Sequence, residues 1–284
     1  MATNVLKFLH LNVRSLVSSF DSFKNTLLQY NCHICCLCET WLTDSITDDQ
    51  IHIDSYTLLR NDRGCRGGGV AIYIKSCLGH KSLNVIGNIE QLWISFTLNR
   101  QSYVFGVVYK PPQCNYNYFI NELETSLSLA VPESDVVVLA GDFNIDLNNC
   151  DSLASLALID AVIAFDMVQV IDCPTRITPS TCTLIDLVFV SDRDLILNSA
   201  VVPADDISDH ELIVCSLKTD VADVAASWRT YRTFRYFNLD SFLTDLYAIP
   251  FYFMYDMLLV GDKVNFLMRH LANLFEHHLP ELIF

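Results

Sequence analysis

Short apolar runs rich in Val, Ile, Phe and Tyr recur along the first 218 residues, and they restrict the fold more than any other feature. Ten runs have the length of a strand, among them VLKFLHLNV, GVAIYIK, SYVFGVVY and DVVVLAGDF. Only three stretches with helical spacing lie between them. A doubly wound parallel sheet needs a helix after nearly every strand. The pattern therefore predicts a layered α/β protein with largely antiparallel sheets.

The three helical stretches each carry one apolar face. In the first, SLVSSFDSFKNTLLQY, the face consists of Leu16, Phe20, Phe23, Leu27 and Leu28. The second is NYNYFINELETSLSLAV, and the third begins at Cys150 with a cap expected at Asn149 or Asp151. These helices are expected to cover the outer faces of the sheets.

Acidic residues are concentrated in the middle of the chain. The formal net charge is −15, and residues 111–217 carry 17 Asp or Glu against 2 Lys or Arg. This balance disfavours a protein that binds nucleic acid through bulk electrostatic attraction. It is typical of a site that gathers carboxylates around a divalent cation, with arginines that contact phosphate confined to the first half.

Eleven cysteines are scattered through apolar segments such as CHICCLC. Reduced and buried thiols are the expected state. A metal site built from Cys32, Cys35, Cys36 and Cys38 is the alternative, although the sequence offers no second cysteine pair or His-x3-His partner.

The sequence carries no sign of export or membrane insertion. No apolar run approaches the roughly 20 residues that cross a bilayer. The N-terminal MATNVLKFLHLNV alternates apolar and polar residues and has no small-residue cleavage site, so it predicts a first strand. We expect an intracellular protein, nuclear or cytoplasmic, with no membrane partner.

Polar residues capable of chemistry stand at the ends of several expected strands. They are Asn12, Glu39, Tyr109, Asp142, Asn144, Asp186, Asp209 and His210. Each alone has an ordinary explanation, such as a helix cap, a turn or a buried aromatic ring. Loops at strand ends expose side chains on a fixed scaffold, so catalytic residues collect there. Two carboxylates directly after core strands, together with the acid–imidazole pair Asp209–His210, favour an active site.

The same segments resemble the endonuclease/exonuclease/phosphatase family. Its motifs appear in order and at approximately the family spacing over about residues 5 to 217, as HLNVRSL, CETWL, RGGGVAIYI, VVYKPP, LAGDFNID, TLIDLVFVS and SDHELI. More narrowly, the segments are similar to the endonuclease at the N-terminus of non-LTR (LINE-type) retrotransposon polyproteins. The resemblance implies a four-layer α/β sandwich of two facing sheets, with a metal-dependent site where strand ends meet.

The resemblance also implies a metal site. Glu39 is expected to be the principal ligand of Mg²⁺, or of Mn²⁺ in its place, because hard cations prefer carboxylate oxygen. Asn12 lies beside it by analogy, assisting the metal or contacting phosphate. Asp209 is expected to complete the site while Asp186 holds the His210 imidazole, or the two carboxylates exchange these roles.

The remaining residues would act on the phosphodiester. Asp142 is expected to orient or deprotonate the attacking water, and Asn144 to hold the scissile phosphate. Tyr109 donates a phenolic hydrogen bond to that phosphate or to the leaving oxygen. His210 serves either as a protonated donor or as a general base.

Further contacts with double-stranded DNA are expected outside this group. Arg14 follows Asn12 and is placed to contact phosphate, and Thr175 and Thr183 match positions where relatives carry hydroxyls near DNA. Arg63 and Arg66, in RGCRGGGVAIYI, either touch the DNA backbone or belong to a solvated loop.

The glycines of that loop do not form a phosphate-binding P-loop. No Gly-Lys-Ser/Thr follows Gly67–Gly69, and the run leads into a strand instead of a helix. A tight turn at a sheet edge is therefore expected there.

The chain divides at about residue 218. Residues 1–218 are expected to form the nuclease-type domain, and residues 219–284 a linker and a short helical appendage with segments at 239–247 and 260–277. The stretch YRTFRYFNLDSFLTDL is similar to the connector that leads into a reverse transcriptase, so that domain is the expected partner in an intact polyprotein.

Three functions remain open from the sequence. The first is a Mg²⁺-dependent DNA endonuclease that nicks a target strand for a non-LTR retrotransposon. The second is an abasic-site repair nuclease, or a phosphatase of phosphoinositides or other small phosphates, with the same fold. The third is a catalytically inactive fragment of an element. All eight strand-end residues are present, which favours a competent site.

Overall fold

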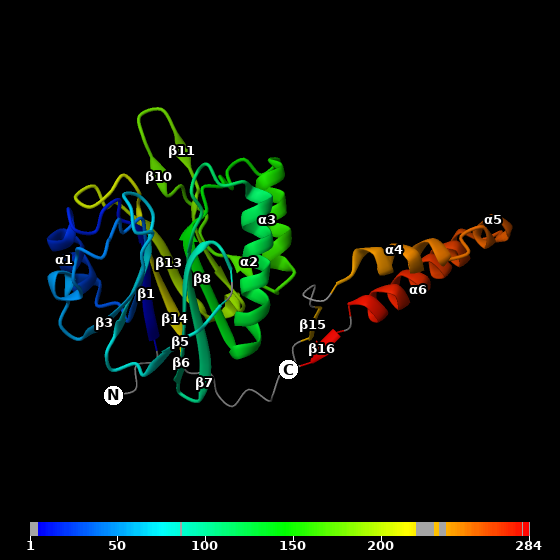
Figure 1. Ribbon diagram of the computed structural model, residues 1–284, viewed down its shortest axis with the longest axis horizontal. Coiled ribbons are helices and arrows are strands. Elements are labelled where there is room, and N and C mark those ends of the chain that lie inside the picture. The colour runs from blue at the N-terminus through cyan, green and yellow to red at the C-terminus, as the bar shows by residue number, and fades with distance from the viewer. Residues whose placement is uncertain (1–4, 86, 220–229, 233–236, 280, 284) are drawn as a thin grey trace. The chain divides into compact units, whose positions relative to one another are not determined.

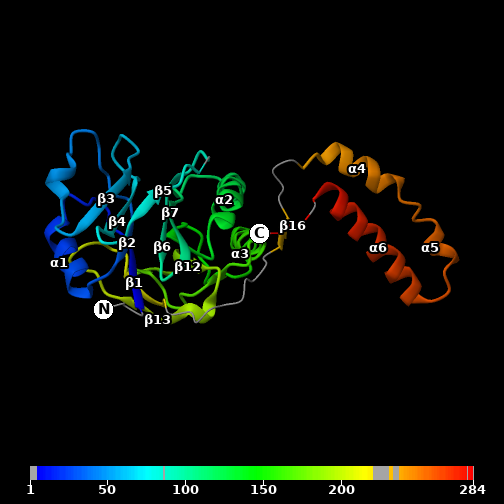
Figure 2. The ribbon, with the colours of Figure 1, turned by 90° about the horizontal axis from the view of Figure 1, so that it is seen from below.

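The structure is a computed structural model that describes residues 5–85, 87–219, 230–232, 237–279 and 281–283. It divides into two compact units, Met1–Asp223 and Val224–Phe284. The first unit has the predicted fold, an α/β sandwich of two mostly antiparallel sheets flanked by helices (Figures 1 and 2).

Each sheet of the first unit has six strands. One has the order β13-β14-β1-β2-β4-β3, formed by Ile196–Val202, Leu212–Lys218, Val5–Asn12, Ile34–Cys38, Val70–Lys75 and Tyr56–Asn61. The other has the order β5-β6-β7-β8-β12-β9, formed by His80–Ser82, Glu90–Leu98, Gln101–Tyr109, Val136–Asp142, Asp186–Val190 and Val168–Gln169. A hairpin of β10 (Arg176–Ile177) and β11 (Cys182–Thr183) projects at one end of the sandwich (Figure 1).

One pair of strands in each sheet is parallel, and this determines where strand ends meet. Strands β1 and β2 are parallel, as are β7 and β8. Parallel neighbours need a crossover, which α1 (Phe20–Tyr30) and α2 (Tyr116–Ala130) provide. The carboxyl ends of these four strands therefore lie at one end of the sandwich. The amino ends of β12 and β14 join them, because β12 runs antiparallel to β8 and β14 antiparallel to β1.

The helices cover the outer faces of the sheets, α1 on one side and α2 and α3 on the other (Figure 2). In α1 the side chains of Phe23 and Leu27 are buried, whereas Leu28 points to solvent because it lies about 100° further round the helix. The third helix, α3, spans Leu153–Ile163 and is capped by Ser152, whose hydroxyl accepts the backbone N–H of Ser155 at 3.0 Å. The cap predicted at Asn149 or Asp151 was therefore wrong. Short 3₁₀ turns lie at Asp48–Ile51, Val131–Glu133 and Arg193–Leu195.

The cysteine-rich strand β2 belongs to the core. Side chains alternate along a strand, so Cys36 and Cys38 face the layer between the sheets while Cys35 faces α1 together with Cys32. Burial raises the pKa of all four thiols. The alternative of a four-cysteine metal site is therefore wrong, because the thiols lie on two faces of the sheet.

The second unit is described by itself. It contains α4 (Leu239–Ala248), α5 (Phe253–Asp256), α6 (Val260–His278) and a two-stranded sheet of β15 (Thr230–Arg232) and β16 (Glu281–Ile283). The two predicted helical segments correspond to α4 and α6. Within the described part of the chain, the structure contains no helix with the length and apolar character that crossing a membrane requires.

Candidate active site

Asn12, at the carboxyl end of β1, joins two carboxylates. Its side chain is fully buried, and Nδ2 donates hydrogen bonds to Glu39 Oε1 at 3.0 Å and to Asp142 Oδ2 at 2.8 Å. Glu39 follows β2 in one sheet, and Asp142 ends β8 in the other. One amide thus bridges the strand ends of the two sheets.

Glu39 is half-buried and accepts three hydrogen bonds. Besides Asn12, Tyr109 Oη donates to Oε1 at 3.0 Å and Trp41 Nε1 donates to Oε2 at 3.1 Å. The backbone at Glu39 and Trp41 is left-handed, with φ of 53° and 54°, a conformation that costs free energy in non-glycine residues. Strain of this kind collects at functional sites, and here it turns the chain immediately after β2. Burial and the Glu39 carboxylate raise the pKa of Tyr109, so the phenol stays protonated as a donor.

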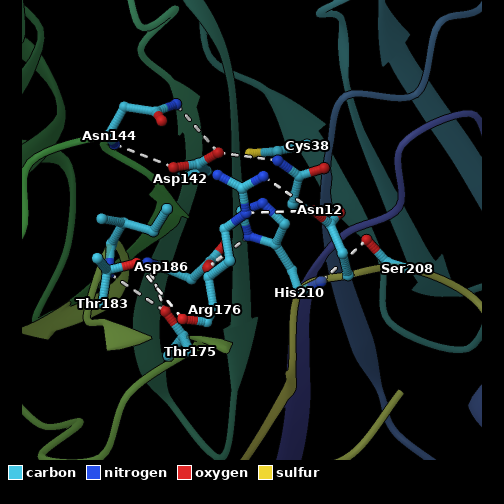
Figure 3. A network of polar contacts seen from close by, with 12 residues as sticks. Asn12, Cys38, Asp142, Asn144, Thr175, Arg176, Thr183, Asp186, Ser208 and His210 are labelled. Atoms are coloured by element: carbon cyan, nitrogen blue, oxygen red, sulfur yellow. Dashed lines mark hydrogen bonds and ion pairs between the residues drawn. The ribbon is translucent and has the colours of Figure 1, made fainter. Parts of the chain in front are cut away.

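Asp142 is buried and held by Asn144. The backbone N–H of Asn144 donates to Oδ1 at 3.0 Å, and its Nδ2 donates to Oδ2 at 3.2 Å (Figure 3). Asn144 also has a left-handed backbone, with φ of 45°. Burial raises the pKa of Asp142, and the charge of the neighbouring Asp186 adds to this increase. An acid with a raised pKa can exchange a proton near neutral pH.

Asp186 and His210 form a buried pair. Nδ1 of His210 lies 2.7 Å from Oδ2 of Asp186. Asp186 stands directly opposite Asp142 in the register of β12 and β8, so His210 reaches the same centre as Asn12 and Asp142 (Figure 3). Burial lowers the pKa of His210, but the charge and hydrogen bond of Asp186 outweigh this and raise it overall.

A second histidine, His10, contacts the other side of Asp186. His10 is fully buried on β1, with Nδ1 3.1 Å from the Cys36 carbonyl oxygen and Nε2 3.4 Å from Asp186 Oδ1. A carbonyl only accepts, so Nδ1 carries the proton. Burial raises the pKa of Asp186, but His210 and His10 together outweigh this effect and hold that pKa below its ordinary range. Sequence reasoning missed His10, although its place two residues before Asn12 on the same face of the strand was a usable signal.

Asp209 lies apart from this group and is paired with arginines. Its carboxylate is 3.0 Å from Arg14 Nη1 and 2.9 Å from Arg176 Nη2. Both arginines are partly exposed, and Arg14 lines a cleft of about 510 Å³ together with Trp41, Asp209 and His210. Asp209 was predicted to lie with Glu39 and Asn12 in the metal site, but its partners in the structure are two arginines. Sequence reasoning missed one of them, Arg176.

A sequence model of the endonuclease/exonuclease/phosphatase family matches residues 4–210, a range that contains every residue described above. The chain belongs to this family. No curated protein sequence matches the chain significantly.

Several solved structures share the fold at low sequence identity. The endonuclease domain of TRAS1, a telomere-specific non-LTR retrotransposon, is 13% identical with a TM-score of 0.61, covering 76% of this chain and all of that one. The AP endonuclease LMAP from Leishmania major is 14% identical with a TM-score of 0.62, covering 76% and 89%. TDP2 of D. rerio, in complex with a single-strand DNA product, is 15% identical with a TM-score of 0.57, covering 76% and 100%. At these identities the likeness establishes the fold alone.

The endonuclease/exonuclease/phosphatase centre has donors that suit a metal ion. Ligand atoms of Asp142, Asp186 and His210 lie within 4.8 Å of one another. Asp186 Oδ1 has His10 Nε2 3.4 Å away and accepts no hydrogen bond of good geometry from any described residue. Glu39 adds a further carboxylate close to Asp142, since Asn12 Nδ2 donates to both. Carboxylate and amide oxygens are the ligands of hard divalent cations, so this group of the family site can hold one.

The two threonines expected near DNA occupy different surroundings. Thr175 is fully buried, and its hydroxyl accepts the backbone N–H groups of Ile185 and Asp186 at 3.2 and 2.9 Å. Its hydroxyl therefore anchors the start of β12. Thr183 is half-buried on the β10–β11 hairpin, opposite Arg176.

Proposed function

We propose that this protein is a metal-dependent DNA endonuclease that nicks one strand of undamaged duplex for a non-LTR retrotransposon. One observation carries the proposal. The hydrogen-bonded group of Glu39, Asn12 and Asp142 and the pair of Asp186 and His210 meet at one end of the sandwich, where a phosphodiester can contact both.

The cation is proposed to be Mg²⁺, or Mn²⁺ in its place, held by Glu39 with Asn12 and Asp142 beside it. When bound, such an ion neutralises negative charge on the phosphate oxygens and polarises the phosphorus towards attack. We assign no direct ligand role to Asp209, because both arginines already neutralise its carboxylate.

Asp142 is proposed to accept the proton of the attacking water. Its raised pKa makes it a better base than an ordinary carboxylate, and Asn144 fixes the orientation of the carboxylate. The water oxygen bonds to phosphorus as the bond from phosphorus to the 3′ oxygen breaks. The leaving 3′ oxygen takes up a proton from solvent water, so the products are a 5′ phosphate and a 3′ hydroxyl, the end that primes reverse transcription.

His210 is proposed to act as the protonated donor. Its Nδ1 proton is held by Asp186, which leaves Nε2 to donate to the phosphate oxygen on which charge accumulates. Tyr109 would supply a second donor by turning its one phenolic proton from Glu39 to the same phosphate or to the leaving oxygen. The raised pKa of His210 favours this cationic form over the general-base alternative.

The substrate class is proposed from the surroundings of the centre. Arg14 and Arg176 provide cationic groups beside His210, suited to the phosphates of a DNA strand. The motifs of the chain are similar to those of retrotransposon endonucleases, and the TRAS1 endonuclease domain shares the fold. In an intact polyprotein the residues after 218 would lead to a reverse transcriptase.

Supercoiled plasmid separates this function from the alternatives. With Mg²⁺, we expect relaxation of undamaged plasmid that is not suppressed by equimolar abasic oligonucleotide or soluble inositol phosphate. Cleavage confined to the abasic oligonucleotide would support a repair nuclease instead. Phosphate release from the inositol phosphate without plasmid relaxation would support a phosphatase.

A further inference from the structure

The glycine turn of RGCRGGGVAIYI leaves space into which an arginine side chain packs. Gly67, Gly68 and Gly69 have φ of 91°, 66° and 83°, in the left-handed region that glycine tolerates. A Cβ built on Gly68 would meet Cζ of Arg63 at 2.3 Å, closer than any real contact. The missing side chain therefore leaves the space that the Arg63 guanidinium fills.

Glu90 holds the Arg63 guanidinium in that position on the turn. Its Oε1 accepts from Arg63 Nε at 2.8 Å and also from Nη2, and its Oε2 accepts the backbone N–H of Gly69 at 2.5 Å. One carboxylate thus fixes both the arginine and the turn. Charge-assisted hydrogen bonds between a guanidinium and a carboxylate are stronger than bonds between neutral groups.

The same guanidinium lies against the ring of Tyr109. Cζ of Arg63 is 5.6 Å from the ring centroid, within the range of a cation–π contact. Tyr109 stands directly opposite Glu90 in the register of β7 and β6. The hydroxyl at the other end of the ring donates to Glu39 at 3.0 Å.

We propose that Arg63 is a positioning residue. It packs on the Gly67–Gly69 turn, is held there by Glu90, and fixes the Tyr109 ring so that the Tyr109 hydroxyl points into the active site. This role rests on the proposed function. It also separates Arg63 from Arg66, whose guanidinium lies 5.4 Å from the ring centroid of Trp41. Direct contact with DNA phosphate, the role that the sequence left open for both arginines, would act mainly on binding.

The two roles differ in the kinetic constant that each changes. In single-turnover nicking, we expect Arg63→Met to lower the maximal rate about ten-fold or more with little change in the DNA concentration at half-maximal rate, because misoriented catalytic groups lose rate. Arg193→Met, at an exposed arginine that donates to the Gln169 carbonyl oxygen away from the site, should leave the maximal rate unchanged. In a Tyr109→Phe background, Arg63→Met should cost little further, since the hydroxyl that it orients is already gone.

Two glycine variants test whether the packing of Arg63 on the turn matters, without changing the arginine itself. Gly68→Ala should reproduce the loss of rate, because its Cβ displaces Arg63. Gly64→Ala is the matched control, since Gly64 has a similar φ of 76° but its Cβ would meet nothing within 4 Å. The inference is overturned if Arg63→Met changes only the half-maximal DNA concentration, or if its effect is undiminished in the Tyr109→Phe background.

A readout independent of activity separates this inference from the proposed function. If the wild-type protein nicks no DNA, the proposed function fails, and 3-fluorotyrosine placed at position 109 still reports the ring by ¹⁹F NMR. Arg63→Met and Gly68→Ala should both shift that resonance, and Gly64→Ala should not. An unchanged resonance in the first two variants, with melting temperatures showing that they are folded, refutes the positioning role.

Discussion

At the scale of single residues, the centre is defined by two neighbouring buried carboxylates whose hydrogen-bond partners differ in kind. Asp186 contacts imidazole on both oxygens, whereas Asp142 contacts neutral amide donors. Both are desolvated, but Asp186 also contacts the imidazoles of His210 and His10, so the pKa of Asp186 falls and that of Asp142 rises. Carboxylates with separated pKa values suit different roles, the one orienting an imidazole and the other accepting a proton.

Removing the imidazole of His210 should remove the proton donor. We expect His210→Ala to lower the rate of plasmid nicking by at least about 10²-fold, the usual scale for losing a general acid or base. The far-ultraviolet circular dichroism should stay that of a folded protein. A folded His210→Ala protein that nicks at the wild-type rate would exclude His210 from the mechanism.

The Asp186–His210 pair should make stability depend on pH in a defined direction. The raised pKa of His210 means that its contribution is complete below about pH 6.5, the ordinary value, and is lost as pH rises through the folded pKa. The lowered pKa of Asp186 means that its contribution persists down to acid pH.

In EDTA, Asp186→Asn should therefore destabilise the protein more at pH 5.5 than at pH 9, by up to about 3 kcal/mol for a buried pair that loses one partner. Urea unfolding measures this. Asp194→Asn, at an exposed carboxylate, is the control and should show no such difference. Equal destabilisation by Asp186→Asn at both pH values would contradict a charged pair.

His10 should matter although it is remote from solvent. His10→Phe keeps a ring of similar size but places hydrocarbon against Asp186 Oδ1, so we expect a loss of about 1–3 kcal/mol in the free energy of unfolding. The control is His52→Phe, since His52 is exposed. If thermal or urea unfolding shows the two variants to be equally stable, His10 does not support Asp186.

The sequence identified the residues of the centre better than their partners. Asn12, Glu39, Asp142, Asp186 and His210 stand at strand ends, and strand ends can be recognised from hydropathy. Asp209 carries no local sign that Arg14 and Arg176 neutralise it, because those residues lie far away in sequence. Pairings across the sheets depend on topology, which single-sequence patterns do not contain.

At the scale of elements, the parallel pairs β1–β2 and β7–β8 do most to assemble the site. Their crossover helices, α1 and α2, were visible as 3.6-residue periodicity. The short strands β9, β10 and β11 were not, since two residues are too few to show alternation. The start of α3 was also misplaced, because several residues in NNCDS can cap a helix and only the geometry selects Ser152.

The corrected helix start makes a prediction about stability. Ser152→Ala should lower the free energy of unfolding by about 1 kcal/mol, because the backbone N–H of Ser155 loses its acceptor at the amino end of α3. Asp151→Ala should change it little and serves as the neighbouring control. Urea unfolding that ranks the two substitutions in the opposite order would place the cap at Asp151.

At the scale of the whole molecule, the excess of acidic residues is compatible with the proposed DNA substrate because of where the charges lie. Asp142 and Asp186 are buried in the centre, and Asp209 is neutralised by arginines, so these carboxylates do not face solvent as free anions. Arg14 lines the same cleft as His210, and Arg176 pairs with His210 in a β-bridge; both arginines are partly exposed. We therefore expect DNA binding to depend on a few placed cations and a metal ion more than on overall charge.

The dependence of nicking on Mg²⁺ is the most direct test that one metal centre joins the strand ends. Wild-type protein should relax supercoiled plasmid with Mg²⁺, lose this activity in EDTA and regain it when Mg²⁺ is restored. Glu39→Gln should need a higher Mg²⁺ concentration for half-maximal rate, whereas Glu133→Gln, distant in sequence and outside the site, should titrate as wild type. Nicking that persists in EDTA, or a Glu39→Gln protein with the wild-type Mg²⁺ response, would contradict the account.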